Sequence, residues 1–133
     1  MLDSRIQEIG MGAYKELKIY ERSYKAALAV YRMTERYPEE EKYGITSQMR
    51  RAAVSIALNI SEGNAKRESA QEFRRFLMMA MGSANEMSVL IEFSKDLGYI
   101  EEEMYVKAKN EYEEIAKMIR VFIKRIEDPT PKP

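Results

Sequence analysis

The hydrophobic positions of this chain recur with a helical period in four separate stretches. The first stretch carries a seam with 3-4-3-4-3 spacing, which is typical of a helix in a bundle or coiled coil. That seam consists of Leu17, Tyr20, Tyr24, Ala27, Tyr31 and Thr34. A second stripe, about 130° round the same helix, consists of Ile19, Ala26, Val30 and Met33. Because a helix with two apolar stripes needs two neighbours, the pattern predicts a packed helix over residues 14–36.

The same period predicts three further helices, over residues 45–65, 69–97 and 101–127. Their expected core faces are Met49, Ala52, Ala53, Ile56 and Ile60; then Phe73, Phe76, Leu77, Ala80, Ala84, Met87, Ile91 and Ser94; then Ala108, Tyr112, Ile115, Ile119, Phe122 and Ile126. Four long helices with short connections and no strand pattern predict an all-α fold, an antiparallel up-and-down four-helix bundle. Residues 1–13 are expected to be a mobile leader, and residues 128–133 a disordered tail.

Local signals mark the ends of these helices. Tyr37 precedes Pro38, and a residue before proline avoids the α region, so the first helix should stop there. Ser69 and Glu72 match a capping box, in which the glutamate side chain reaches back to the serine backbone. Gly98 stands where a glycine ends a helix. The acids at positions 101–103 suit the positive end of the dipole of the fourth helix.

The most unusual stretch lies in the third helix. Residues 76–91 carry a single formal charge, Glu86, although a third of the chain is charged. A run of this length turns more than four times round a helix, so it has no ordinary solvated face. A monomer rarely exposes so much apolar surface, and the run is too short and too polar to span a membrane. We therefore expect copies of the chain to associate through this region.

Composition excludes several kinds of chemistry. The chain has no cysteine, so disulfides, zinc–thiolate sites and cysteine nucleophiles are unavailable. It also has no histidine, which removes the usual general base and the commonest metal ligand. Phosphate-binding loops and serine-nucleophile motifs are absent. We expect no enzyme activity and no metal or other cofactor. An enzyme that uses Glu62, Glu86 or tyrosines in a channel is the less favoured class.

The net charge does not indicate binding to nucleic acid or to an anionic membrane, because 22 basic and 22 acidic residues cancel. The N-terminus lacks the basic flank and apolar run of a secretory signal, and no apolar stretch is long enough to cross a bilayer. The sequence therefore predicts a cytoplasmic protein without a membrane role.

Several polar residues fall within the apolar parts of the second and third helices. A hairpin of these helices would place Arg50 and Arg51 level with Asn85 and Glu86. Since a buried carboxylate needs a partner, we expect one of the arginines to bind Glu86 in a structural role. Asn59 and Glu62 are expected on the covered side of the second helix, where polar residues fix register. A ligand site in a ring channel is the alternative for that pair.

The charges are unevenly distributed along the chain. Residues 50–75 hold six basic and three acidic residues, whereas residues 92–114 hold eight acidic and three basic ones. The cations Lys66, Arg67, Arg74 and Arg75 gather at one end of the expected hairpin, and a ring would repeat them around a rim. They are candidate phosphate contacts for RNA or DNA. From the sequence alone, ordinary helix-end charge, or salt bridges to the acidic fourth helix across a subunit boundary, is the favoured interpretation of these cations.

A long part of the sequence resembles a known family. The segment EEKYGITSQMRRAAVSIALNISEG (residues 40–63), then EFRRFL (72–77) and GSANEMSVLIEFSKDLGYI (82–100), resembles the bacterial four-helix-bundle proteins encoded in intervening sequences of 23S rRNA genes. The opening YKELKIYERSYKAALAVY (14–31) is similar to the first helix of that family. The resemblance covers about residues 14–126. Departures from the family pattern are Ala57, where proline is common, and Asn64, Ala65 and Lys66, where a small, glycine-rich stretch is usual.

The resemblance implies a homopentamer and no known catalytic residues. The family is also distantly similar to the accessory protein of diversity-generating retroelements, a basic pentamer that binds reverse transcriptase and RNA. We therefore expect a non-enzymatic homo-oligomer that contacts RNA or a nucleic-acid-processing protein. A purely protein-binding scaffold is the alternative, since the chain is neutral. The methionines Met78, Met79 and Met81 fit an adaptable partner-binding surface or an oligomer core equally.

Overall fold

The computed structural model describes the backbone of residues 11–128 and the side chains of residues 18–128. Four long helices make up this part of the chain: α2 (Met11–Thr34), α3 (Ile45–Ala65), α4 (Ala70–Asp96) and α5 (Glu102–Glu127). A short 3-10 helix, η1 (Glu39–Glu41), lies in the connection between α2 and α3. The described residues contain no strand, so the prediction of an all-α fold with four helices is confirmed.

The observed bounds differ from the expected ones mainly at α2. This helix begins at Met11, so the leader expected over residues 1–13 extends three residues too far, and residues 1–10 lie outside the described residues. It ends at Thr34, two residues before the expected end, because residues 35 and 36 form a turn ahead of Pro38. At the C-terminus, Asp128 follows α5 without being helical, and the rest of the expected tail lies outside the described residues.

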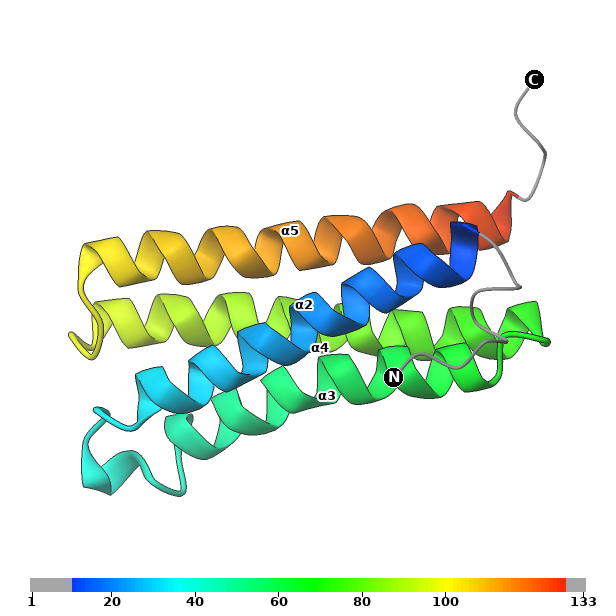
Figure 1. Cartoon of the computed structure of the whole chain (residues 1–133). Coiled ribbons are helices and arrows are strands. Elements are labelled where there is room, and N and C mark those ends of the chain that lie inside the picture. Colours follow the sequence, from blue (N-terminus) through cyan, green and yellow to red (C-terminus); the bar gives the residue numbers. More distant parts are fainter. Residues whose placement is uncertain (1–10, 129–133) are drawn as a thin grey trace.

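The four helices lie side by side along one long direction, and α2 crosses the others obliquely (Figure 1). The connection from α3 to α4 lies at one end of the molecule, and the other two connections lie at the opposite end. The contact between α3 and α4 is the most extensive, whereas α2 touches α5 least. The α3–α4 pair is therefore the centre of the fold.

The core consists of the apolar faces that the helical period indicates. The predicted face of α3 is buried throughout, and on α4 and α5 the predicted residues are buried except Phe76, Ala108 and Ile126, which are half-buried. On α2 the second stripe buries Ile19, Ala26 and Val30, and the predicted seam buries Ala27 and Thr34. Tyr24 and Tyr31 of the predicted seam remain exposed. Because α2 crosses obliquely, its tyrosine side faces outward over the edge of α3 instead of into the core.

The ends of α4 follow from single residues. The Oγ of Ser69 accepts a hydrogen bond from the backbone N–H of Glu72 at 3.2 Å. The Glu72 carboxylate does not reach back as the capping box predicts, because it binds Arg75 instead. At the other end, Gly98 adopts φ = 79°, and the N–H groups of Gly98 and Tyr99 donate to the carbonyls of Lys95 and Ser94. This pair of bonds is a Schellman motif, so the predicted glycine terminus is confirmed.

None of the described helices combines the length and the hydropathy needed to cross a lipid bilayer.

Candidate functional site

The four candidate phosphate-binding cations lie at the end of the molecule where α3 turns into α4. Lys66 is the C-terminal capping residue of α3, and Arg67 lies in the turn. Arg74 and Arg75 follow in the first two turns of α4. All four residues therefore lie on neighbouring parts of the α3–α4 connection and the start of α4, as the sequence predicts. We refer to Lys66, Arg67, Arg74 and Arg75 as the basic end.

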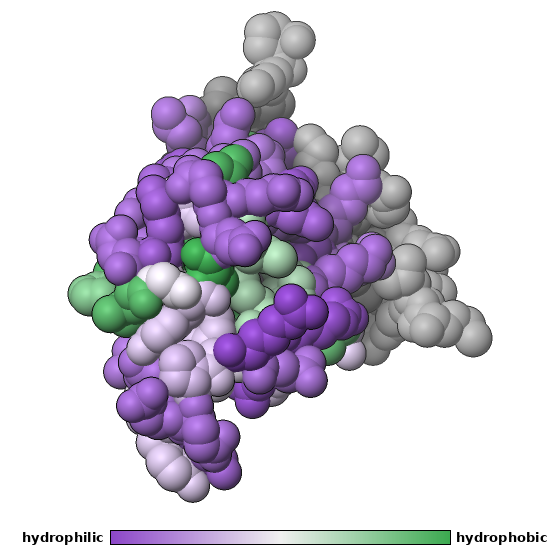
Figure 2. Space-filling model, turned by 90° about the vertical axis from the view of Figure 1, so that its left-hand side faces the viewer, coloured by the Kyte–Doolittle hydropathy of each residue, from purple (hydrophilic) through white to green (hydrophobic). Residues whose placement is uncertain are grey.

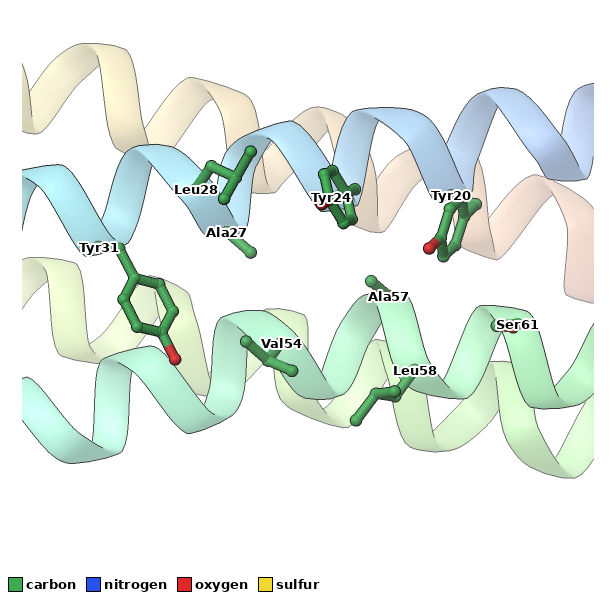
Figure 3. Close-up of a pocket in the computed structure, with 9 residues that line it drawn as sticks. All are labelled: Tyr20, Tyr24, Ala27, Leu28, Tyr31, Val54, Ala57, Leu58 and Ser61. Atoms are coloured by element: carbon green, nitrogen blue, oxygen red, sulfur yellow. The ribbon is translucent and has the colours of Figure 1, made fainter. Parts of the chain in front are cut away.

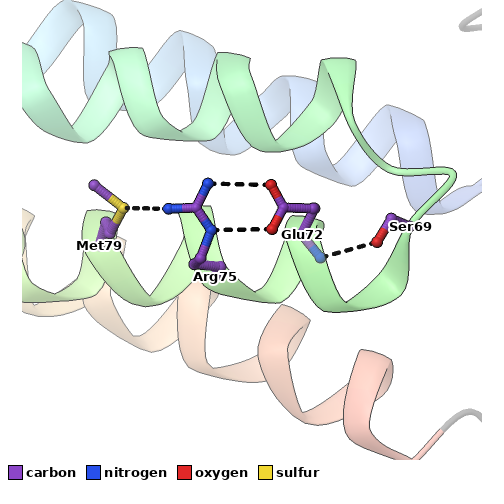
Figure 4. A network of polar contacts seen from close by, with 4 residues as sticks. All are labelled: Ser69, Glu72, Arg75 and Met79. Carbon is purple, nitrogen blue, oxygen red and sulfur yellow. Dashed lines mark hydrogen bonds and ion pairs between the residues drawn. The ribbon is translucent and has the colours of Figure 1, made fainter.

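Arg75 belongs to a small polar network on the surface of α4 (Figure 4). Its Nε and Nη2 each donate to a carboxylate oxygen of Glu72 at 3.1 Å, which makes the pair bidentate. The hydrogen bonds from Arg75 lower the pKa of Glu72 and raise the pKa of the guanidinium. The guanidinium also lies 4.4 Å from the centre of the Phe76 ring. Arg75 thus lies within cation–π distance of an aromatic side chain.

The other cations of the basic end also have neighbours within the subunit. Arg74 Nε lies 2.6 Å from a carboxylate oxygen of Glu127, which joins α4 to α5. Arg67 Nη1 donates to the backbone carbonyl of Asn64 at 2.7 Å. The Lys66 ammonium lies 5.7 Å from the centre of the Phe76 ring. The ion pairs of Arg74 and Arg75 are solvent-exposed, so each contributes little to the free energy of folding. Another anion can therefore replace the glutamate in either pair.

The opposite end of the molecule carries a cluster of acidic residues, which we refer to as the acidic end. Glu39 and Glu40 of η1 and the three glutamates at positions 101–103 are exposed there. Glu41 accepts a hydrogen bond from the Tyr99 hydroxyl at 2.7 Å, which lowers the pKa of the Glu41 carboxyl. Figure 2 shows this end as mostly hydrophilic, with a few hydrophobic residues between the polar ones. The two ends of the molecule therefore differ in charge.

The expected ion pair of Glu86 does not form within the subunit. Glu86 and Asn85 are exposed on α4, and so is Arg51 on α3. Arg50 donates from Nε to the Thr34 hydroxyl at 2.9 Å and lies 4.7 Å from the centre of the Tyr31 ring. The pair is absent within the single subunit because Arg50 is turned toward α2, whereas Arg51 and Glu86 are exposed.

The expected polar pair on α3 is also corrected. Glu62 is exposed, so it is not on the covered side of the helix. Asn59 is half-buried, and its amide donates to the carbonyl and hydroxyl of Ser55 at 2.9 and 3.0 Å. The Ser55 hydroxyl oxygen also accepts a hydrogen bond from the Ser83 hydroxyl of α4, with 2.9 Å between the two oxygens. A serine pair is therefore one of the polar contacts between α3 and α4, and the charge pattern could not indicate it.

A second polar cluster joins α4 to α5 and had no signal in the sequence. The Tyr105 hydroxyl donates to Glu92 Oε1 at 2.6 Å, and Lys109 Nζ donates to the same oxygen at 2.9 Å. The Tyr105 and Lys109 hydrogen bonds lower the pKa of the Glu92 carboxyl. The Tyr105 hydroxyl and Glu92 also raise the pKa of the Lys109 ammonium. The cluster therefore ties α4 to α5 through two hydrogen bonds to one carboxylate oxygen.

An apolar groove runs between α2 and α3 (Figure 3). Its lining carries no charged side chain and consists of Tyr20, Tyr24, Ala27, Leu28, Tyr31, Val54, Ala57, Leu58 and Ser61. We refer to these nine residues as the tyrosine groove. Ala27 and Ala57 face each other across the middle of the groove, where their small side chains leave it open. Four of the lining residues, Tyr20, Tyr24, Ala27 and Tyr31, belong to the α2 seam that the sequence predicts to face the interior of a bundle.

A second apolar surface follows the outer side of α4. It consists of Met78, Met79, Gly82, Glu86, Val89 and Phe93, which are all exposed and which we refer to as the α4 stripe. Both surfaces contain large hydrophobic residues that are open to solvent. Each of these residues exposes between 41 and 60% of its surface. Single exposed apolar residues are ordinary, whereas large contiguous apolar patches are typical of interaction sites.

Comparison with known proteins identifies relatives of the chain. A family model described as "23S rRNA-intervening sequence protein" matches residues 15–121. A crystal structure of a protein of unknown function from the S23 ribosomal protein family of Bacteroides thetaiotaomicron VPI-5482 is similar in fold, with a TM-score of 0.75. It shares 26% sequence identity, and the alignment covers 83% of this chain and 98% of that one. A search of the curated proteins gave no match.

Proposed function

The chain belongs to the 23S rRNA-intervening sequence protein family, and from that membership we propose that it is a non-enzymatic, cytoplasmic accessory protein that works as a homo-oligomer. Its working form is a ring of antiparallel four-helix bundles, with five copies by the family resemblance. The ring presents the basic end of each subunit to RNA or to a nucleic-acid-processing protein.

The exposed apolar surface carries this proposal. Eight large hydrophobic residues of the tyrosine groove and the α4 stripe are open to solvent in the single subunit: Tyr24, Leu28, Tyr31, Leu58, Met78, Met79, Val89 and Phe93. Burying apolar surface yields roughly 25 cal/mol per Å² before the costs of association, so two surfaces of this kind favour self-assembly. The methionines among them adapt to a partner surface.

The order of contacts along the helices supports the antiparallel arrangement. On α4 and α5, Arg74 lies beside Glu127, whereas Lys95 lies beside Glu102. Residue numbers therefore rise along one helix as they fall along the other. The short connections between successive helices fit the same arrangement.

Nucleic-acid contact is supported by the position and exposure of the basic end. A ring would place one copy of Lys66, Arg67, Arg74 and Arg75 per subunit around the same rim. Arg75 on the Phe76 ring resembles the flat platform on which bases stack. Their exposed ion pairs can give way to phosphates, with release of counterions.

A protein-binding scaffold without nucleic-acid contact is the second candidate. It is favoured by the neutral net charge and by the ion pairs that Arg74 and Arg75 already make within the subunit. In this case the basic end serves only the stability of the bundle.

Retention of structured RNA at low salt separates the two candidates. The wild type should retain RNA, and binding should weaken steeply as salt rises. The variant with Lys66, Arg67, Arg74 and Arg75 all changed to alanine should lose it. A matched control changes four exposed cations elsewhere, Lys25, Arg32, Lys107 and Lys117, to alanine and should still bind. If the wild type retains neither RNA nor DNA at low salt, the scaffold is the better account. Sequencing nucleic acid that co-purifies would then identify the partner.

A further inference from the structure

We propose that the tyrosine groove of one subunit receives the α4 stripe of a second copy, so that the assembly repeats a single head-to-tail contact. This inference rests on the self-assembly proposed above and adds which two surfaces meet. The groove lies between α2 and α3, whereas the stripe belongs to α4. One subunit therefore presents both halves of the contact on different sides.

The shapes of the two surfaces are complementary. The groove is concave, with Ala27 and Ala57 at its centre and the larger side chains toward its ends and edges (Figure 3). The stripe is the convex side of a single helix. Its centre is Gly82, where an added Cβ would meet nothing within 4 Å, so the α4 backbone is bare there. At 1.5 Å per residue the stripe is about 22 Å long and the α2 side of the groove about 16 Å, so one helix covers the groove.

The charges are complementary as well. Glu86 is the one charged residue of the stripe and forms no ion pair with any residue that the structure describes. Arg51 is exposed on α3 and likewise forms no ion pair with any described residue. It lies seven residues, or about two helical turns, before Leu58, so it is on the same side of α3 as the groove. A helix seated in the groove brings Glu86 within reach of Arg51 of the neighbouring copy. The ion pair between Glu86 and an arginine that the sequence predicts would then form between two subunits.

A head-to-tail contact also fits better than a symmetric one. Two grooves facing each other would leave an apolar void, because both surfaces are concave. Two stripes facing each other would bring Glu86 close to its own copy, and like charges across an interface are unfavourable. A contact between two different surfaces repeats from subunit to subunit and closes into a ring when the rotation permits.

A mixing experiment tests the head-to-tail contact. The variant Leu58→Asp blocks only the groove, and Val89→Asp blocks only the stripe; both positions are exposed, so the fold should survive, as circular dichroism would verify. Each variant alone should be a monomer of 15.5 kDa. Mixed together they should form a two-subunit species, since one supplies an intact stripe and the other an intact groove. The control Val106→Asp, on an exposed site of α5 outside both surfaces, should keep the wild-type mass.

The outcomes distinguish this inference from self-assembly itself. A monomeric wild type would overturn the proposed assembly. A wild type that assembles while either variant keeps its mass would overturn only the groove-and-stripe contact, as would a mixture that stays monomeric. Charge reversal gives a second test: Glu86→Arg and Arg51→Glu should each raise the dissociation constant at least about tenfold, and the double variant should recover most of the affinity. A double variant no better than the single ones would contradict the pairing.

Discussion

Gly98 shows how a single residue sets the length of a helix. Its φ of 79° lies in the left-handed region, where it is alone among the described residues. Ser69 acts in a similar way at the start of α4, where its hydroxyl accepts one of the free backbone N–H groups. Both roles follow from backbone chemistry, so the sequence predicts them. The partner of Arg50, the Thr34 hydroxyl of α2, depends on packing between helices, so the sequence does not predict it.

Substitution of Gly98 tests the glycine terminus. Gly98→Ala should lower the free energy of unfolding by about 1 to 2 kcal/mol, because a Cβ is strained in the left-handed region. Gly98→Asn should lose less, since asparagine tolerates that region better. Urea unfolding at one protein concentration would measure both, and equal stability of all three proteins would refute the assignment.

Removal of the Tyr112 hydroxyl is not expected to destabilise the fold, in contrast to the substitutions of Gly98. Its hydroxyl is buried on α5 without a hydrogen-bond partner among the described residues, and burial raises its pKa well above the ordinary value. Tyr112→Phe should therefore leave stability unchanged or raise it by up to about 1 kcal/mol. Tyr105→Phe is the matched control and should destabilise, because that hydroxyl donates to Glu92. Thermal melts should show a lower melting temperature for Tyr105→Phe and an unchanged or higher one for Tyr112→Phe, and a clear loss of stability in Tyr112→Phe would contradict this account.

The pH dependence of stability tests the Glu92 cluster. The hydrogen bonds from Tyr105 and Lys109 lower the pKa of Glu92 in the folded state. A lowered folded pKa stabilises the fold above the unfolded value, and that stabilisation is lost as the pH falls through the folded pKa. Glu92→Gln should therefore be less stable than the wild type at pH 7 and converge with it in acid. A gap that is constant with pH would show that charge plays no part.

At the level of elements, the helical period was sufficient to predict all four helices, because each buries a continuous apolar face. The period did not show which side of α2 enters the core. Both of its stripes have helical spacing, and the choice depends on the oblique crossing of α2 (Figure 1). The pairing expected for Glu86 failed for a related reason, since a charge in an apolar run is not by itself evidence that its own subunit buries it.

The close contact of α3 and α4 depends on small residues. Ala53 and Ala84 are completely buried. Ala84→Leu should overfill this contact and cost about 1 to 3 kcal/mol of unfolding free energy. Ala29→Leu, on an exposed part of α2, should have little effect. Equal urea midpoints for the two variants would show that the contact can expand freely.

At the level of the whole molecule, the single subunit has a basic end, an acidic end and two apolar surfaces along its sides. The sequence predicted the basic end and a need for self-association, because both follow from the order of charges and apolar residues. It did not predict the groove, whose walls come from α2 and α3 and exist only once the helices pack. We expect the mass of the protein in solution to depend on those apolar surfaces.

Light scattering on the purified wild type, over a dilution series in physiological buffer, tests the central claim directly. We expect a mass that is a multiple of the 15.5 kDa chain, about 78 kDa for five copies of 15.5 kDa. A stable, well-folded species of 15.5 kDa at every concentration would contradict the claim that copies of the chain cover each other's apolar surfaces.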